Sequence, residues 1–253
     1  MLSATRHDKI LETLQQEKGS STAALSKLIK VTEATIRQDF NKLESQGLIK
    51  RIHGGAILTK NSDFELSYNE YKERFNNEKQ RIAEAASRFI SDGDTILLDA
   101  STTVLQIAKR LDWKYNLVVI TNAPDIILEL AGKNNFSVIS TGGMLRAKSM
   151  SLVGPTAESN LEELRANTLF IGINGITFEE GITTVSPLEA QVKKAMIRSS
   201  KQVIGVTDSS KFGKVESSIV GPLTILNKII TDKNIPEKYL KNFEKKGIEL
   251  IIV

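Results

Sequence analysis

The sequence predicts an α/β protein in two parts, a small basic helical domain followed by a larger domain built on a mostly parallel sheet. Its 253 residues suit one or two domains. The first 60 residues hold 10 Lys and Arg against 6 Asp and Glu, whereas the remainder holds 24 of each. After residue 93, short β-prone runs alternate with helical segments, as is typical of a parallel sheet covered by helices. We therefore place the domains at 1–58 and 76–253, joined by a linker at 59–75.

The composition excludes several classes of protein. There is no cysteine, which removes disulfides, thiol nucleophiles and cysteine-bound metals. The two histidines, His7 and His53, both lie in the basic domain, so we expect no metal site and no cofactor. The first residues lack the apolar core of a signal peptide, and no stretch approaches the ~18 apolar residues of a spanning helix. We expect a cytoplasmic protein.

Three helical segments open the basic domain. Apolar residues between positions 10 and 14 share one helical face, and Gly19 ends that helix. Hydroxyl groups at 20–22 precede a second helix that reaches Ile29, and Thr32 can cap a third over 33–46. The spacing predicts a helix-turn-helix.

The third helix presents polar side chains opposite its apolar stripe, which is either a solvated face or a surface for a DNA major groove. Arg can bind guanine through two hydrogen bonds and Gln can bind adenine, so the second interpretation makes this the recognition helix. Residues 48–58 form two β-prone runs around a basic turn, the hairpin of a winged helix. We expect contacts with double-stranded DNA from Ser21, Thr22, Thr32, Thr35, Arg37, Gln38, Lys42, Arg51 and His53.

The predicted linker starts with polar residues at 59–63 and then carries Tyr68, Tyr71 and Phe75 among charges. A polar linker leading into a helix at 76–90 would let the two domains be placed independently. Basic neighbours do not dominate around the aromatic residues, so we expect packing anchors rather than a surface for stacked bases.

Seven β-prone runs and five helical stretches make up the larger domain. The runs are 95–98, 117–120, 136–139, 169–171, 202–206, 228–231 and 249–252. The helical stretches are 103–111, 125–131, 157–164, 188–199 and 237–246. In parallel sheets of this kind, ligands bind at the carboxyl ends of the strands.

Small or polar residues follow the first five of these runs, which predicts a ligand site along one edge of the sheet. Glycines let the backbone approach a ligand, and Asn and Thr hydrogen-bond to hydroxyl groups. The expected ligand-binding residues are Asp99, Ser101, Thr102, Thr103, Thr121, Asn122, Gly142, Gly143, Arg146, Asn174, Glu189, Lys193, Asp208 and Lys211.

Three consecutive hydroxyl residues at 101–103 stand where a helix begins, a position that can hold an anion. Ordinary helix capping explains one hydroxyl but not three. Glu189 and Lys193 lie one helical turn apart and are equally well explained as a surface ion pair. Asp208 and Lys211, just past a strand end, suit sugar hydroxyls and a phosphate.

The basic domain resembles the DeoR family of bacterial transcriptional regulators. The resemblance rests on the run Thr35-Ile36-Arg37-Gln38-Asp39-Phe40, on Leu43-Glu44 and Gly47, and on Arg51-Ile52-His53-Gly54-Gly55-Ala56. It implies that Thr35, Arg37 and Gln38, and with them Lys42, face DNA. An acid there would repel phosphates, so we expect Asp39 to pair inside the protein, with an Arg or a helix end.

The larger domain resembles the effector domain of the same family, which is similar to ribose-5-phosphate isomerase and related enzymes. The matching runs are 99–103, 121–122, 142–143, 172–175, Glu189 with Lys193, and 208–213. The resemblance implies a winged helix-turn-helix joined to a Rossmann-like domain. It also implies a phosphorylated sugar ligand, with its phosphate at 101–103 and its carbohydrate near Asp99, Asn174, Glu189, Asp208 and Lys211.

Two residues depart from the family pattern. Ser101 stands where Gly is usual, and its side chain either narrows the range of ligands or adds a hydrogen bond. Asn167 stands where Asp is frequent.

Two functions follow from these patterns. The first is a regulator, most simply a repressor of a sugar-metabolism operon, that forms a homodimer or larger homo-oligomer and whose operator affinity a sugar phosphate controls. The alternative is a sugar-phosphate isomerase with a DNA-binding appendage, in which Glu189 or Asp208 would act as the base. Sixty residues of DNA-binding domain favour the regulator, which would not be an enzyme.

Overall fold

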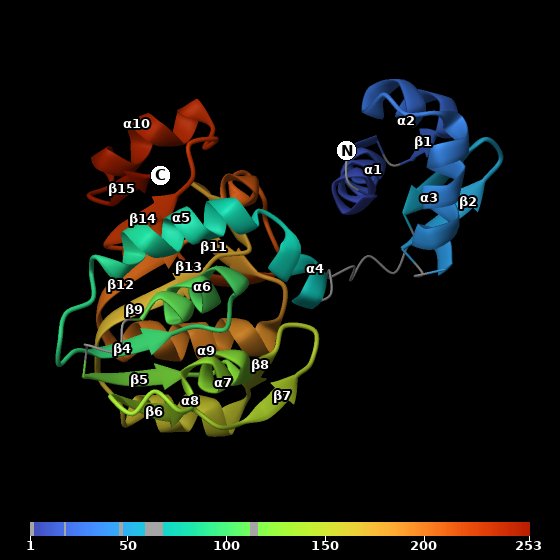
Figure 1. Ribbon diagram of the computed structural model, residues 1–253. Helices are drawn as coiled ribbons and strands as arrows, with labels where there is room; N and C mark the ends of the chain where they lie inside the picture. The colour runs from blue at the N-terminus through green and yellow to red at the C-terminus, as the bar shows by residue number, and fades with distance from the viewer. Residues whose placement is uncertain (1–2, 18, 46–47, 59–67, 112–115) are drawn as a thin grey trace. The chain divides into compact units, whose positions relative to one another are not determined.

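The computed structural model describes residues 3–17, 19–45, 48–58, 68–111 and 116–253 and divides into two compact units (Figure 1). We call them the head, Met1–Glu65, and the body, Leu66–Val253. Part of the predicted linker, residues 68–73, folds as a helix that belongs to the body.

The head has the three predicted helices and the predicted hairpin. Its elements are α1 (Ser3–Glu17), β1 (Ser20–Ser21), α2 (Thr22–Ile29), α3 (Glu33–Ser45), β2 (Ile49–Ile52) and β3 (Gly55–Leu58). Position 46, included in the predicted third helix, lies outside the described residues. The helices and hairpin enclose one apolar core, whose fully buried side chains include Ile10, Leu14, Leu25, Ile36 and Phe40.

Strand β1 was not predicted. Its two residues pair antiparallel with β3, so the wing is a three-stranded sheet in the order β1-β3-β2. Gly55 permits this pairing, because a Cβ there would collide with the carbonyl oxygen of Ser20. Two residues are too few to show an alternating pattern in the sequence.

The body is built on a seven-stranded parallel sheet in the order β15-β14-β12-β9-β4-β5-β6. All seven predicted runs form these strands. They are β4 (Thr95–Leu98), β5 (Leu117–Thr121), β6 (Phe136–Ser140), β9 (Ala166–Gly172), β12 (Ser200–Val206), β14 (Lys228–Thr231) and β15 (Glu249–Ile252).

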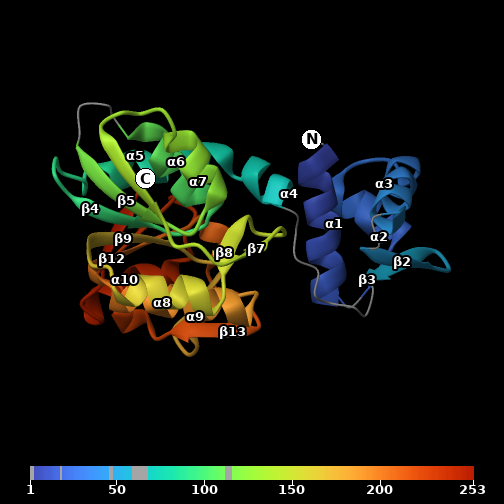
Figure 2. The same ribbon diagram turned by 90° about the horizontal axis from the view of Figure 1, so that it is seen from below.

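Helices cover both faces of the sheet, giving three layers (Figure 2). One face is covered by α5 (Asn76–Ser87), α6 (Thr102–Arg110) and α7 (Pro124–Leu130), and the other by α8 (Pro155–Glu162), α9 (Pro187–Arg198) and α10 (Glu237–Lys245). Each face has its own apolar cluster because the central strands are buried on both sides.

Several short elements escaped prediction. These are α4 (Tyr68–Glu73), the hairpin of β7 (Met144–Arg146) and β8 (Ser151–Val153), and an antiparallel sheet of β10 (Gly175–Thr177), β11 (Gly181–Thr184) and β13 (Ser218–Gly221). Each is too short for its periodicity to stand out in the sequence. All except α4 follow strands of the main sheet, where the predicted ligand residues lie.

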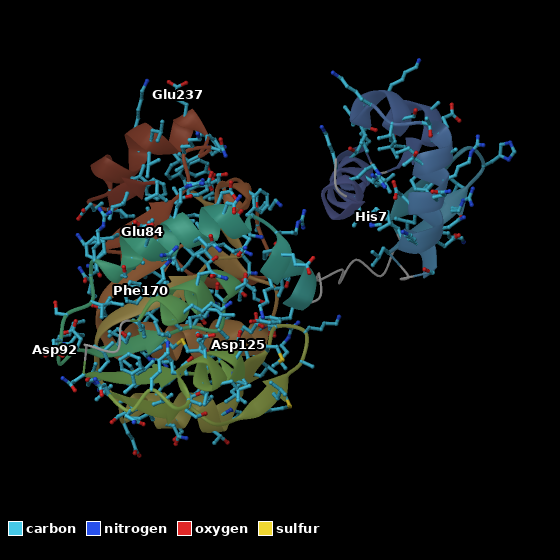
Figure 3. The ribbon with its side chains drawn as sticks, in the orientation of Figure 1. His7, Glu84, Asp92, Asp125, Phe170 and Glu237 are labelled. Atoms are coloured by element: carbon cyan, nitrogen blue, oxygen red, sulfur yellow. The ribbon has the colours of Figure 1, made fainter. Side chains whose placement is uncertain are left out.

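The order of the strands reverses between β4 and β9. From β4 the chain runs outward through β5 to β6, then returns to β9 on the opposite side of β4. Such a switch point leaves a crevice at the carboxyl ends of the two strands, where ligands bind in open α/β sheets. In Figure 3, Asp125 at the start of α7 and Asp92 before β4 mark opposite ends of the strands.

Candidate functional site

Helix α3 carries the expected recognition surface. The side chains of Arg37, Gln38 and Lys42 are exposed, while Ile36 and Phe40 are buried beneath them. The guanidinium of Arg37 donates a hydrogen bond to Glu33 at 3.1 Å, an exposed pair one helical turn apart. Such a pair is worth only a few tenths of a kcal/mol, about 0.3–0.5, so Arg37 is readily available to another acceptor.

Asp39 points into the head, as expected for an acid on this helix. Its carboxylate accepts hydrogen bonds from Arg6 at 2.5 and 2.8 Å and contacts His7 Nε2 at 2.9 Å. Burial alone would raise the pKa of Asp39, but the bonds from Arg6 and His7 outweigh it and hold the pKa below its usual value. This partly buried ion pair therefore joins α1 to α3, and the predicted pairing of Asp39 inside the protein is confirmed, with an Arg as its partner.

The hydroxyl residues of the head mainly stabilise its turns. Ser21 caps α2 by accepting from Ala24 N–H, and Thr32 accepts from Thr35 N–H at the start of α3. Thr22 is buried and its hydroxyl donates to the carbonyl of Gly54, which removes this side chain from the expected DNA-facing set.

The wing presents exposed basic and polar side chains. Arg51 and His53 are both exposed. The guanidinium of Arg51 donates a hydrogen bond to the side-chain oxygen of Asn41 in α3 at 2.8 Å. The backbone N–H of Arg51 donates to the carboxylate of Glu44 at 3.0 Å. These bonds hold the wing against α3, so the two parts of the expected DNA-binding surface form one rigid unit.

The switch point of the body is closed by a buried ion pair. Asp99, directly after β4, accepts a hydrogen bond from Gly172 N–H at the end of β9 at 2.9 Å and pairs with Lys193 of α9. Lys193 also donates to the carbonyl of Gly172 at 2.9 Å. Burial raises the pKa of Asp99, against the opposing effect of Lys193. Lys193 and Glu189 are both buried, and each pairs with another residue, Lys193 with Asp99 and Glu189 with Arg146. The surface ion pair between Glu189 and Lys193 considered above is therefore not formed.

Ser101 fills the space beside Gly172. A Cβ on Gly172 would collide with the Ser101 side chain. The glycine at position 172, at the end of β9, therefore leaves the space that Ser101 needs. The Ser101 hydroxyl caps α6 by accepting from Thr103 N–H at 3.2 Å. The Ser101 hydroxyl therefore satisfies one of the backbone N–H groups that a helix N-terminus otherwise offers to an anion.

Cations gather near the first turn of α6. Lys79 of α5 is buried, and both its ammonium and the Thr102 hydroxyl donate to the carbonyl of Tyr71, which places the two groups side by side. The pKa of Lys79 is lowered to about 8, mainly by burial and also by nearby Lys211 and Arg74, against the opposing effect of Asp208. Burial also lowers the pKa of Lys211. An anion bound here would relieve the repulsion among these cations.

A second polar network lies around Glu189 at the start of α9. The Glu189 carboxylate accepts from Arg146 of β7 at 3.2 Å, from Thr184 of β11 at 3.0 Å and from Ser151 of β8 at 3.4 Å. Thr184 also lies 3.0 Å from the side-chain oxygen of Asn174. Elements far apart in the sequence thus bring Arg146, Asn174 and Glu189 together.

Other expected ligand residues shape the loops instead. Thr121 is fully buried and donates to the Leu98 carbonyl, and Asn122 bonds the backbone of Ala100 and Leu152 with its amide. Both side chains therefore support the loops that follow β4 and β5.

The remaining polar and glycine positions also have backbone roles. Gly142 and Gly143 both have positive φ, and a Cβ on Gly143 would collide with the Val153 carbonyl. Asn167 accepts from Thr95 N–H at the amino end of the sheet, away from the carboxyl ends of the strands, so its departure from the family pattern does not touch the site.

The sequence reasoning missed Lys79, Arg74 and Tyr71 as members of this site. Lys79 and Arg74 lie in a charge-rich stretch with no strand end nearby, so no spacing distinguished them from surface residues. The one available signal was Tyr71, expected to be a packing anchor. Among the described residues, no group of three His, Cys, Asp or Glu could hold a metal ion, and no helix is long and apolar enough to cross a membrane.

A winged helix-turn-helix joined to a parallel α/β body defines a class, the DNA-binding regulators with a separate second domain. The chain belongs to the DeoR family: residues 6–62 match the DeoR-like helix-turn-helix domain and residues 74–233 match the DeoR C terminal sensor domain. It is a DNA-binding transcriptional regulator.

Relatives match along almost the whole chain. The uncharacterized HTH-type transcriptional regulator YulB of Bacillus subtilis (strain 168) is 38% identical, over 100% of this chain and 98% of its own length. The putative aga operon transcriptional repressor of Escherichia coli O157:H7 is 31% identical, over 98% and 93%.

Two solved structures are similar to part of the chain. Ribose 5-phosphate isomerase a from Methanocaldococcus jannaschii is similar with a TM-score of 0.41 and 13% identity, over 54% of each chain. The translation initiation factor eIF-2B of Pyrococcus horikoshii OT3 is similar with a TM-score of 0.42 and 16% identity, over 86% of this chain and 71% of its own.

Proposed function

We propose that the protein is a repressor whose operator affinity is controlled by a phosphorylated sugar bound to the body. The observation that carries the proposal is a cluster of cations beside the first turn of α6, made of the buried Lys79 and the half-buried Lys211 and Arg74. Concentrating desolvated positive charge is costly unless an anion joins it. A helix N-terminus beside these cations provides further donors for a phosphate.

The sugar would lie across the carboxyl ends of β4 and β9. Thr102, Thr103, Lys79 and Lys211 would hold the phosphate, and the network of Arg146, Asn174 and Glu189 supplies donors and acceptors for hydroxyl groups. Asp208 accepts from Ser210 N–H at 3.1 Å and contributes negative charge beside the lysines. Asp99 and Lys193 would support the site through Gly172.

A thermal-shift screen with sugar phosphates, each beside its unphosphorylated sugar, tests the ligand. At about 100 times its dissociation constant a ligand adds ~2.7 kcal/mol to the stability of the body, so its unfolding temperature should rise clearly. We expect at least one phosphorylated compound to act and its free sugar to fail. Equal shifts from sugar and sugar phosphate would reject the phosphate site.

Replacing Arg37 with Ala tests the DNA-binding surface. We expect operator affinity to fall about 5- to 150-fold, since a good contact between Arg and guanine contributes ~1–3 kcal/mol of discrimination. Electrophoretic mobility shifts at fixed salt measure the affinity. Arg37→Lys keeps the charge but loses the paired geometry, and should retain non-specific binding. Unchanged operator affinity in Arg37→Ala would contradict the role of α3.

The regulator would act as a homodimer or larger homo-oligomer. Two heads on a symmetric assembly would contact two half-sites, which implies a pseudo-palindromic operator. Coupling between the ligand and DNA is reciprocal: if the sugar phosphate weakens operator binding tenfold, operator DNA weakens sugar-phosphate binding tenfold, a coupling of ~1.4 kcal/mol.

The geometry gives the isomerase alternative less support. A general base must be free to accept a substrate proton, whereas the Glu189 carboxylate already accepts from Arg146, Thr184 and Ser151. Incubation with sugar phosphates followed by product analysis distinguishes the two functions, because a regulator leaves each compound unchanged.

A further inference from the structure

One residue of the short helix α4 contacts three groups of the proposed phosphate site. The carbonyl of Tyr71 accepts from the ammonium of Lys79 and, at 3.5 Å, from the hydroxyl of Thr102. The ammonium of Lys211 lies 5.0 Å from the centre of the Tyr71 ring, within the range of a cation–π interaction. The groups that would hold a phosphate therefore also hold α4.

Helix α4 needs these contacts to stay helical. It has six residues, and isolated helices below about 12 residues are marginal in water. Its first residue, Tyr68, donates a hydrogen bond to the carboxylate of Asp125 at the start of α7, which Figure 3 labels. Tyr68 and Tyr71 thus attach α4 to the body at two points.

The position of α4 in the chain gives these attachments a consequence. Residues 59–67 connect β3, the last strand of the head, to Tyr68. If α4 detaches from the body, its six residues join the connection between the head and the body. The stretch of chain that tethers the head then becomes longer. The spacing of two heads on an operator depends on that tether.

We propose that α4 and the phosphate compete for Lys79, Lys211 and Thr102, so that the effector releases α4 and thereby changes how the heads are tethered. The inference rests on the phosphate site proposed above. Phosphate oxygens form charge-assisted hydrogen bonds, about twice as strong as those to a neutral carbonyl. The lysines that turn toward the phosphate leave the carbonyl and the ring of Tyr71, so that α4 loses these contacts with the body.

Hydrogen exchange of the full chain with and without inorganic phosphate tests the competition. We expect phosphate to slow exchange in the first turn of α6 and to speed exchange in α4 several-fold. If α6 is protected while α4 is unchanged or slowed, a lysine bridges both partners and the competition is wrong, although the phosphate site stands. If phosphate protects neither helix and does not stabilise the body, both proposals fail.

Tyr68→Phe tests the same inference without altering the cations. The variant loses the bond to Asp125, so α4 competes less well and phosphate should bind about three- to tenfold more tightly, the equivalent of one hydrogen bond. Ser200→Ala is the control, because it removes a side-chain hydrogen bond to the carbonyl of Met196 at the amino end of β12, away from α4 and from the proposed phosphate site. Equal phosphate affinity in the two variants would overturn the inference.

Discussion

Asp39→Ala is expected to unfold the head while leaving the body folded. The change removes the charged acceptor of Arg6 and His7, and a hydrogen bond to a charged group contributes about 1.5–3 kcal/mol. A domain of about 60 residues has a total stability of only ~3–9 kcal/mol. Calorimetry should show the unfolding transition of the head lost or strongly lowered, and operator binding should disappear with it.

The control for this prediction is Glu33→Ala, which removes an exposed carboxylate from the same helix. We expect the head to stay folded, since that pair contributes a few tenths of a kcal/mol, about 0.3–0.5. Retained operator binding in Asp39→Ala would show that the ion pair with Arg6 does not hold the head together.

The stabilisation from Asp39 should also depend on pH. Its folded pKa is lowered from the ordinary value of 3.8, so the carboxylate stabilises the head above pH 3.8 and the effect is lost as pH falls through the folded pKa. The stability difference between the wild type and Asp39→Ala should therefore shrink in acid below that value.

Lys79→Met is expected to abolish sugar-phosphate binding and to stabilise the body. Its pKa falls from 10.5 to about 8, so keeping this buried lysine charged at neutral pH costs up to about 3 kcal/mol. Methionine has a similar length and no charge, but it leaves the carbonyl of Tyr71 without this donor, which reduces the gain. Urea unfolding measures the stability, and the sugar-phosphate screen measures the binding.

The pH dependence of unfolding shows whether the stability gained in Lys79→Met comes from removing the buried charge. Between pH 8 and 10.5 the unfolded chain binds a proton at Lys79 that the folded chain has released, so the wild type gains stability as pH rises through this window. The stability of Lys79→Met should lack this part of the increase with pH. Lys201→Met, at an exposed lysine of β12, should change neither property. Full sugar-phosphate affinity in Lys79→Met would contradict its role in the site.

The architecture follows from local patterns. All seven strands of the main sheet and the six helices that cover it could be predicted because each buries an apolar run that repeats with its own period. The short strands β10, β11 and β13 could not, since their form depends on partners distant in the chain. Local pattern likewise predicted that Asp39 pairs inside the head, because an acid on a surface facing DNA phosphates is unfavourable.

The sequence by itself determined the two-part organisation, the winged helix and the edge of the sheet where a ligand would bind. Only the tertiary structure decided which polar residues share that edge. It assigned Thr121 and Asn122 to loop support, paired Asp99 with Lys193, and brought Lys79 and Tyr71 beside Thr102. The physical reason is that periodicity records which side of an element is buried, whereas hydrogen-bond and charge partners are set by packing between elements far apart in the sequence.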